Sequence, residues 1–202
     1  MARMKDRPGR HGAGEGEAPL ALPRGHREKI LADLGRERLL YGAVLLGVVL
    51  ELGLGLFIWN ELRDLGAAPE RSSLAWLGGL GALALAHLAA ARWVSGRLGR
   101  PGPLMERVRS TLEEAGLPGA EPSPEVLTVV AIRAAFVSDV VAWILIQFVT
   151  VYGLVAVVMT GSLAALLGFV ALSVLGLVVA APRPGKAVGL AEALHGLAAR
   201  KG

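Results

Sequence analysis

Residues 140–181 carry no charged side chain, and this stretch constrains the fold more than any other feature of the chain. A helix rises about 1.5 Å per residue and the hydrocarbon core of a bilayer is about 30 Å thick, so the stretch is roughly twice the length of one crossing. The segment 160–162 (Thr-Gly-Ser) supplies turn-forming and capping residues near its middle. We therefore expect two membrane-spanning helices here, over about 138–159 and 163–181.

Two earlier apolar runs, 39–59 and 74–94, are each long enough for one further crossing. Hydrophobic residues make up 53% of the chain and come in long blocks, which is typical of membrane proteins. The sequence thus predicts an all-α integral membrane protein whose four transmembrane helices form two hairpins, 24–94 and 138–182.

The basic residues lie mainly on one side of these predicted spans. They flank the spans before the first, between the second and third and after the fourth: Arg24, Arg27, Lys29, Arg36, Arg38, Arg97, Arg100, Arg107, Arg109, Arg183, Lys186, Arg200 and Lys201. The positive-inside rule then places both termini and the loop 95–137 in the cytoplasm. Arginine outnumbers lysine, and alanine and glycine are abundant, which favours a bacterial inner (plasma) membrane.

The segments outside the spans differ in composition. Residues 1–23 are rich in glycine, proline and charge, so we expect a disordered cytoplasmic tail, followed by a helix that begins near Arg24. Apolar residues recur at helical spacing in the loop 95–137 and in the tail 183–202, which predicts amphipathic helices. Two placements stay open for these helices: they lie on the membrane surface, or they pack against each other in water.

The start of the third span also leaves two alternatives. Ser123, Pro124 and Glu125 form a good helix start, with a cap, a proline at the first position and an acid in the first turn. One unbroken helix from there to Met159 would be about 54 Å long, longer than the bilayer core. Alternatively, Asp139 and the serine before it begin a second helix, and 125–137 is a separate surface helix.

Polar side chains within the spans define the candidate site. Glu51 lies in the middle of the first span, where a carboxylate costs about 2.5 to 3.5 kcal/mol on insertion scales. Its side chain leans towards the cytoplasm and that of His87 leans outward, so we expect a hydrogen bond between the two. Similar depths add four more residues to a buried polar layer: Gln147, Thr150, Tyr152 and Ser173. This layer is interpreted as packing contacts, as a proton or ion path, or as a ligand pocket.

Small residues and tryptophans indicate how the helices pack. Glycines at spacing four flank Glu51, and a stripe of small residues follows the second span, so close helix packing is expected at Gly47, Gly55, Gly78, Ala82, Ala86 and Ala90. Indole rings favour the membrane–water interface, and four lie near span ends as expected anchors: Trp59, Trp76, Trp93 and Trp143.

The sequence also argues against several classes of function. It contains no Gly-x-Ser-x-Gly element and no His-Glu-x-x-His motif, its four histidines are scattered, and it has no cysteine, so we expect neither an enzyme nor a metal or cofactor site. Basic residues beside a membrane attract anionic lipid head groups, which accounts for the net charge of +4 without a nucleic-acid partner. We expect a structural or accessory component of a membrane complex or a homo-oligomer. The alternative is a small oligomeric proton or cation translocator that uses Glu51 and His87.

Overall fold

The computed structural model of the protein describes residues 24–64 and 73–200, and these residues form helices and no strand. The helices are α1 (Arg24–Asp64), α2 (Ser73–Leu98), α3 (Pro101–Glu114), α4 (Pro124–Thr160), α5 (Leu163–Val179) and α6 (Pro184–Ala199). The start of α1 at Arg24 agrees with the sequence. The tail 1–23, for which disorder is expected, lies outside the described residues.

Three of the described helices are long and apolar enough to cross a membrane. The corresponding segments are Gly35–Asp64 in α1, Leu74–Leu98 in α2 and the whole of α4. Helix α5 is also apolar but has only 17 residues, or about 26 Å at the rise of a helix. The described residues are thus all helical, with three helices of the length and composition of membrane spans, which is compatible with the predicted helical membrane protein.

Helix α4 is continuous from Pro124 to Thr160, so the single long helix is the correct alternative. Its first turn is capped as expected, since the Ser123 hydroxyl oxygen accepts a hydrogen bond from the Val126 N–H at 3.3 Å. It ends at Gly161, whose φ of 62° lies in the left-handed region that glycine adopts without strain. The predicted break between the last two spans is confirmed.

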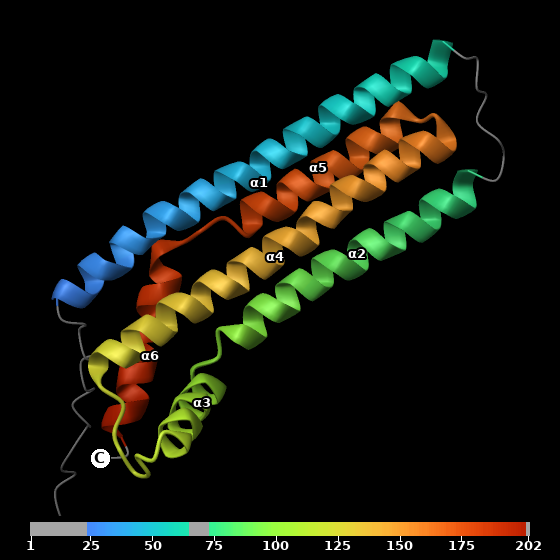
Figure 1. Ribbon diagram of the computed structural model, residues 1–202. Coiled ribbons are helices and arrows are strands. Elements are labelled where there is room, and N and C mark those ends of the chain that lie inside the picture. The colour runs from blue at the N-terminus through green and yellow to red at the C-terminus, as the bar shows by residue number, and fades with distance from the viewer. Residues whose placement is uncertain (1–23, 65–72, 201–202) are drawn as a thin grey trace, which may run out of the picture.

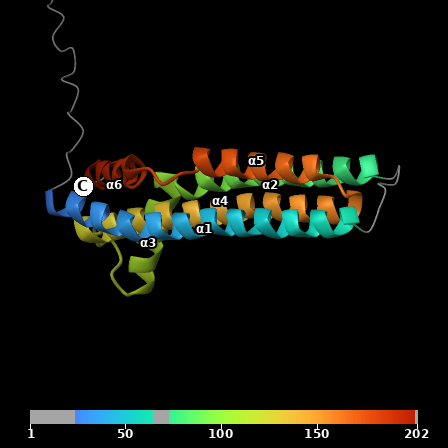
Figure 2. The same ribbon diagram turned by 90° about the horizontal axis from the view of Figure 1, so that it is seen from above.

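Helix α4 lies at the centre of the molecule and contacts α1, α2, α5 and α6. Figure 1 shows α4 and α5 between α1 and α2, and the view from above places α1 with α4 in one layer and α2 with α5 in the other (Figure 2). The first two long helices are consecutive in the chain, but each packs mainly against α4 and not against the other.

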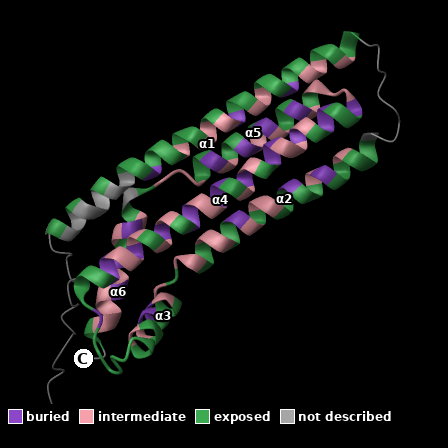
Figure 3. Cartoon of the chain, viewed as in Figure 1, coloured by how far each residue is buried: buried purple, intermediate pink, exposed green. Residues whose placement is uncertain are grey.

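Buried residues form two hydrophobic cores that share α4. The first, here the bundle core, joins α4 to α1, α2 and α5: Val48, Ala91, Ala142, Trp143, Ile146, Val157, Leu166, Val170 and Leu177. The second, here the base core, joins the first half of α4 to α3 and α6: Met105, Val108, Leu127, Ala131, Ala135, Ala187, Leu190, Ala191 and Leu194. The amphipathic helices thus pack against each other and against α4. Figure 3 shows that α1 and α2 expose much of their outer surface.

Candidate functional site

A buried ionic cluster lies where the two cores meet. The ammonium group of Lys186 on α6 forms an ion pair with the Asp139 carboxylate on α4 and donates a hydrogen bond to Ser138 Oγ at 2.9 Å. Glu37 on α1 lies beside Asp139, and its Oε1 atom is buried with no hydrogen-bond partner among the described residues. Glu37 and Asp139 are each 7% exposed and Ser138 is fully buried. We call Glu37, Ser138, Asp139 and Lys186 the ionic cluster; it ties α1, α4 and α6 together.

The charges of this cluster can balance. Two neighbouring carboxyl groups that share one proton carry a single negative charge, so one proton on the Glu37–Asp139 pair would leave it with one negative charge. Lys186 supplies one positive charge. The result is a buried group with no net charge, which is the condition under which ionisable side chains tolerate burial.

The sequence analysis did not find this cluster. Its members at positions 37, 139 and 186 belong to three helices that are far apart in the chain, so no local spacing connects them. Asp139 was expected only as a helix cap or an interfacial residue. One signal was present in the sequence. Glu37 and Asp139 lie at the same predicted membrane edge, and Lys186 follows the last predicted span.

Glu51 on α1 lies beside Gln147 of α4. Gly47, one turn earlier on α1, makes room for this neighbour, because a Cβ atom there would lie 3.2 Å from Gln147 Nε2. Glu51 Oε2 and Gln147 Oε1 are buried and have no hydrogen-bond partner among the described residues. The carboxyl and amide groups are thus adjacent, and each keeps one unpaired oxygen.

His87 does not pair with Glu51, which corrects the expected hydrogen bond. Its Nδ1 lies 3.0 Å from the Leu83 carbonyl oxygen and 3.3 Å from the Tyr152 hydroxyl, and its ring stacks edge-on against Tyr152 with centroids 5.5 Å apart. The reason is the arrangement of the helices: α4 and α5 lie between α1 and α2 (Figure 1). The predicted depths of Glu51 and His87 give the height of each residue along its span. They do not give the order of the helices around the bundle.

Ser173 and Thr150, two of the hydroxyl-bearing residues of the polar layer, differ in their hydrogen bonding. Ser173 Oγ on α5 donates a hydrogen bond to the Ile146 carbonyl oxygen at 3.2 Å. That carbonyl is the acceptor that a threonine hydroxyl four residues later commonly uses within a helix. Thr150 Oγ1 is fully buried and has no partner among the described residues. The six expected polar residues therefore form separate contacts and not one connected layer.

Trp143 lies inside the bundle and not at the lipid surface, which corrects its expected role as an anchor. It is 1% exposed, its Nε1–H donates to the Ala180 carbonyl oxygen at 2.8 Å, and its ring contacts that of Tyr41. The part-buried Ala180 carbonyl at the end of α5 satisfies the indole N–H inside the bundle. Trp76 and Trp93 are 53% and 61% exposed, so their role as anchors stays a prediction, as does that of the half-buried Trp59.

The small residues behave differently on α1 and α2. Gly55 is buried, and a Cβ atom there would lie 2.6 Å from Leu166 Cδ2, so α1 and α5 approach closely at this glycine. Gly78 has no atom of the described residues within 4 Å, and Ala82 and Ala86 are exposed. The outer part of the α2 stripe, from Gly78 to Ala86, thus does not pack within the bundle, whereas Ala90 is half-buried beside Ala91, and the buried face of α2 is formed by Leu80, Ala84 and Ala91.

The site residues give no indication of a bound metal. Among the described residues, no three His, Cys, Asp or Glu side chains lie close enough together to hold a metal ion. No protein family model, curated protein or solved structure matches the chain. The interpretation of function therefore rests on the geometry above.

Proposed function

We propose that this chain is a structural or accessory component of a membrane complex in a bacterial inner membrane. The proposed topology has four spans, with α5 as the short fourth one and both termini in the cytoplasm. It is supported by the basic residues that flank the spans at the base, where α3 and α6 also lie. The polar groups of the bundle support a structural role, since several connect neighbouring helices: Tyr41 to the Leu177 carbonyl, Trp143 to the Ala180 carbonyl and Ser173 to the Ile146 carbonyl.

The observation that carries the accessory role is the outward stripe of α2. Gly78, Ala82 and Ala86 share one exposed face, and small side chains there let the backbone of another helix approach closely. The bundle itself uses the opposite face of α2. The occupant proposed for the stripe is a transmembrane helix of a different membrane protein, because the closely packed α1 glycines of this chain, Gly47 and Gly55, already contact α4 and α5.

The test is to enlarge this stripe and measure association. Gly78→Leu is expected to abolish co-purification of the partner from mild detergent, because the added side chain prevents close approach. Gly53→Leu is the matched control, since Gly53 is exposed on α1 and also has no described atom within 4 Å. Equal co-purification by the two variants would exclude the stripe as the contact surface. A complex that contains only this chain would point to a homo-oligomer.

A second candidate function is a small oligomeric proton or cation translocator. It is favoured by two buried polar atoms at the α1–α4 contact that have no hydrogen-bond partner among the described residues: Glu51 Oε2 and Gln147 Oε1. An unpaired carboxyl oxygen in an apolar span can exchange a proton or bind an entering water or ion. In this version Glu51 acts with Gln147, and His87 belongs to a separate contact with Tyr152.

Flux in proteoliposomes separates the two candidates. A proton or cation current that Glu51→Gln abolishes would support translocation, and Glu61→Gln on the exposed end of α1 is the matched control. No current above that of protein-free liposomes, together with a stable partner in mild detergent, would support the accessory role.

A further inference from the structure

A cavity of about 390 Å³ opens between α2, α4, α5 and the link from α5 to α6. This volume lies within the range of about 300 to 1,000 Å³ that is typical of small-molecule and cofactor sites. The cavity lies at the edge of the ionic cluster, since Asp139 and Lys186 line one of its walls. None of the contacts discussed above uses this space.

One part of the cavity is apolar. Its walls include Leu88 of α2, Ile146 of α4, and Leu172 and Val179 of α5. Gly176 lies on the same wall and brings α5 close to its neighbours, because a Cβ atom there would lie 3.0 Å from Leu88 Cδ2. From Val179 back to Leu172 the apolar wall is about 10 Å long at the rise of a helix. This length and composition suit part of a hydrocarbon chain.

The other part of the cavity is basic. Arg92, Arg183 and Lys186 line it, against a single carboxylate, that of Asp139. Lys186 and Asp139 neutralise each other in the ionic cluster. Within residues 24–64 and 73–200, Lys186–Asp139 is the only ion pair between described side chains. Arg92 and Arg183 therefore have no described acidic partner. Two arginines without a described acidic partner therefore line the cavity, and guanidinium pairs well with phosphate oxygens.

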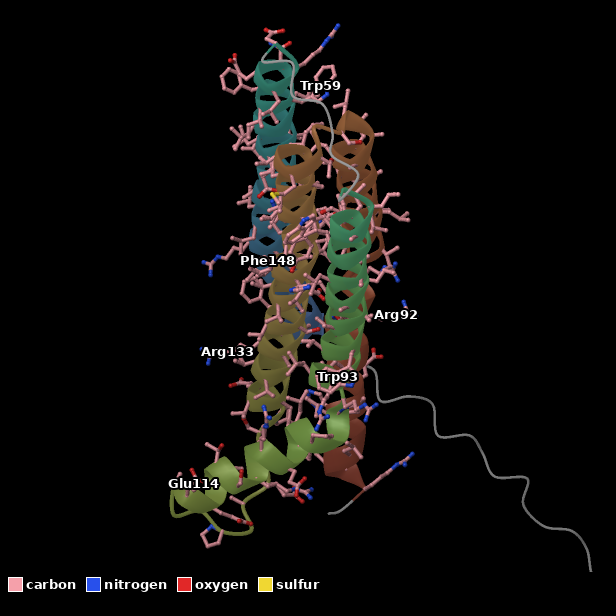
Figure 4. All side chains as sticks on the ribbon, turned by 90° about the vertical axis from the view of Figure 1, so that its right-hand side faces the viewer. Trp59, Arg92, Trp93, Glu114, Arg133 and Phe148 are labelled. Atoms are coloured by element: carbon pink, nitrogen blue, oxygen red, sulfur yellow. The ribbon has the colours of Figure 1, made fainter. Side chains whose placement is uncertain are left out.

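The two arginines come from different elements that meet at the base of the bundle. Figure 4 shows Arg92 near the end of α2 that adjoins α3, on the opposite side of the molecule from Arg133. Arg183 is the residue before the first turn of α6, and its guanidinium donates to the Val179 carbonyl oxygen at 3.2 Å. An arginine at this level of a membrane helix keeps its stem along the apolar surface and its charge at the head-group level.

We propose that this cavity binds an anionic phospholipid, with its phosphate between Arg92 and Arg183 and the first part of one acyl chain between α2 and α5. The basic mouth favours a head group with a net negative charge over a zwitterionic one. The one carboxylate that lines the cavity, that of Asp139, is already paired with Lys186, and no other acidic group among the described residues lines the cavity to bind the ammonium of a choline head group. The apolar part selects a lipid over free phosphate. Basic pockets between transmembrane helices on the cytoplasmic side are a recurrent setting for anionic lipids.

Binding at this place would stabilise the junction of the two cores. Lys186 lines the cavity and also belongs to the ionic cluster, so an ordered phosphate beside it restricts the start of α6. This inference does not depend on the proposed accessory role. The lipid could bind to a lone copy of the chain as well as to a complex.

The first experiment uses the full chain, delipidated in a neutral detergent, and measures ligand binding by native mass spectrometry and by the shift in melting temperature. Dioleoyl phosphatidylglycerol is expected to bind and to raise the melting temperature, whereas dioleoyl phosphatidylcholine, glycerol phosphate and inorganic phosphate are expected to do neither. Equal binding of phosphatidylcholine would overturn the charge selection. Equal binding of glycerol phosphate or inorganic phosphate would overturn the need for an acyl chain.

Variants then locate the site. The double variant Arg92→Gln/Arg183→Gln is expected to bind phosphatidylglycerol about 10- to 30-fold more weakly, since each basic residue near a membrane surface contributes about a factor of five. Arg107→Gln/Arg133→Gln removes the same charge from exposed positions outside the cavity and is expected to leave binding unchanged. An equal loss in both variants would show general surface attraction and would contradict the proposal.

A third variant tests the apolar part. Leu172→Trp fills the space between α2 and α5 without a change of charge and is expected to weaken phosphatidylglycerol binding about tenfold. Circular dichroism and a single elution peak in detergent verify that the variant folds. Unchanged binding by a folded Leu172→Trp would overturn the acyl-chain contact. If this variant does not fold, the comparison of phosphatidylglycerol with glycerol phosphate on the unchanged protein decides the same point.

Discussion

Two buried carboxylate sites, the ionic cluster and the Glu51 contact, solve the same problem in different ways. At the ionic cluster, Asp139 has a lysine and lies next to a second carboxyl group and a serine. Glu51 has only the amide of Gln147, and one carboxyl oxygen stays without a described partner. The difference indicates that the first site depends on its charges, whereas the second can be occupied by a neutral group of the same shape.

The largest effect that distinguishes the two sites is expected from Lys186→Met. Removal of one partner of a buried ion pair leaves uncompensated charge, and we expect the free energy of unfolding to fall by about 3 to 5 kcal/mol. Denaturant titration in micelles, followed by circular dichroism, measures this. Lys186→Arg keeps the charge and is expected to lose much less. A loss below about 1 kcal/mol for Lys186→Met would mean that the ionic cluster is not held by charge.

The comparison becomes sharper when the same chemical change is made at both sites. Asp139→Asn leaves Lys186 without its carboxylate and is expected to lower the free energy of unfolding by about 1 to 3 kcal/mol. Glu51→Gln is expected to be neutral or to stabilise by about 1 kcal/mol, because the new amide N–H can donate to the unpaired Gln147 Oε1. The same titration measures both variants. Similar losses at the two positions would contradict the distinction between them.

A smaller effect tests whether Glu51 depends on the position of Gln147. Gly47→Ala places a methyl group 3.2 Å from Gln147 Nε2 and is expected to lower the free energy of unfolding by about 1 kcal/mol. Gly53→Ala meets no described atom and is expected to stabilise by about 0.5 to 1 kcal/mol through its higher helix propensity. Thermal unfolding of the two variants side by side measures the difference. Equal melting temperatures would show that Gln147 is not held at this place.

The sequence predicted those parts of the fold that depend on local chemistry. The capped start of α4 at Ser123, the break at Gly161 and the start of α1 at Arg24 all follow from residue types within a few positions of each other. The glycines of α1 were also placed correctly, since Gly47 and Gly55 both face neighbouring helices. Helix limits and close-packing glycines are therefore readable from a single chain.

The sequence did not predict how the helices are ordered around α4. Glu51 and His87 have compatible heights, but they lie on helices that α4 and α5 separate, so height alone gave the wrong partner. The stripe from Gly78 to Ala90 has the spacing of a packing face, yet the leucine and alanine face opposite it is the one that is buried. The ionic cluster was missed because its contacts are entirely between distant segments. In each case the missing information is which face of each neighbouring helix packs against α4.

The position of Lys186 in the chain has a consequence for biosynthesis. Every other member of the ionic cluster, and every helix of the bundle core, is synthesised before α6 emerges. Until then, Glu37 and Asp139 have no lysine and the α4 surface of the base core has no cover from α6. A chain stopped before α6 would thus present unpaired acids and bare apolar surface on one face, a state that cellular quality control can distinguish from the finished protein.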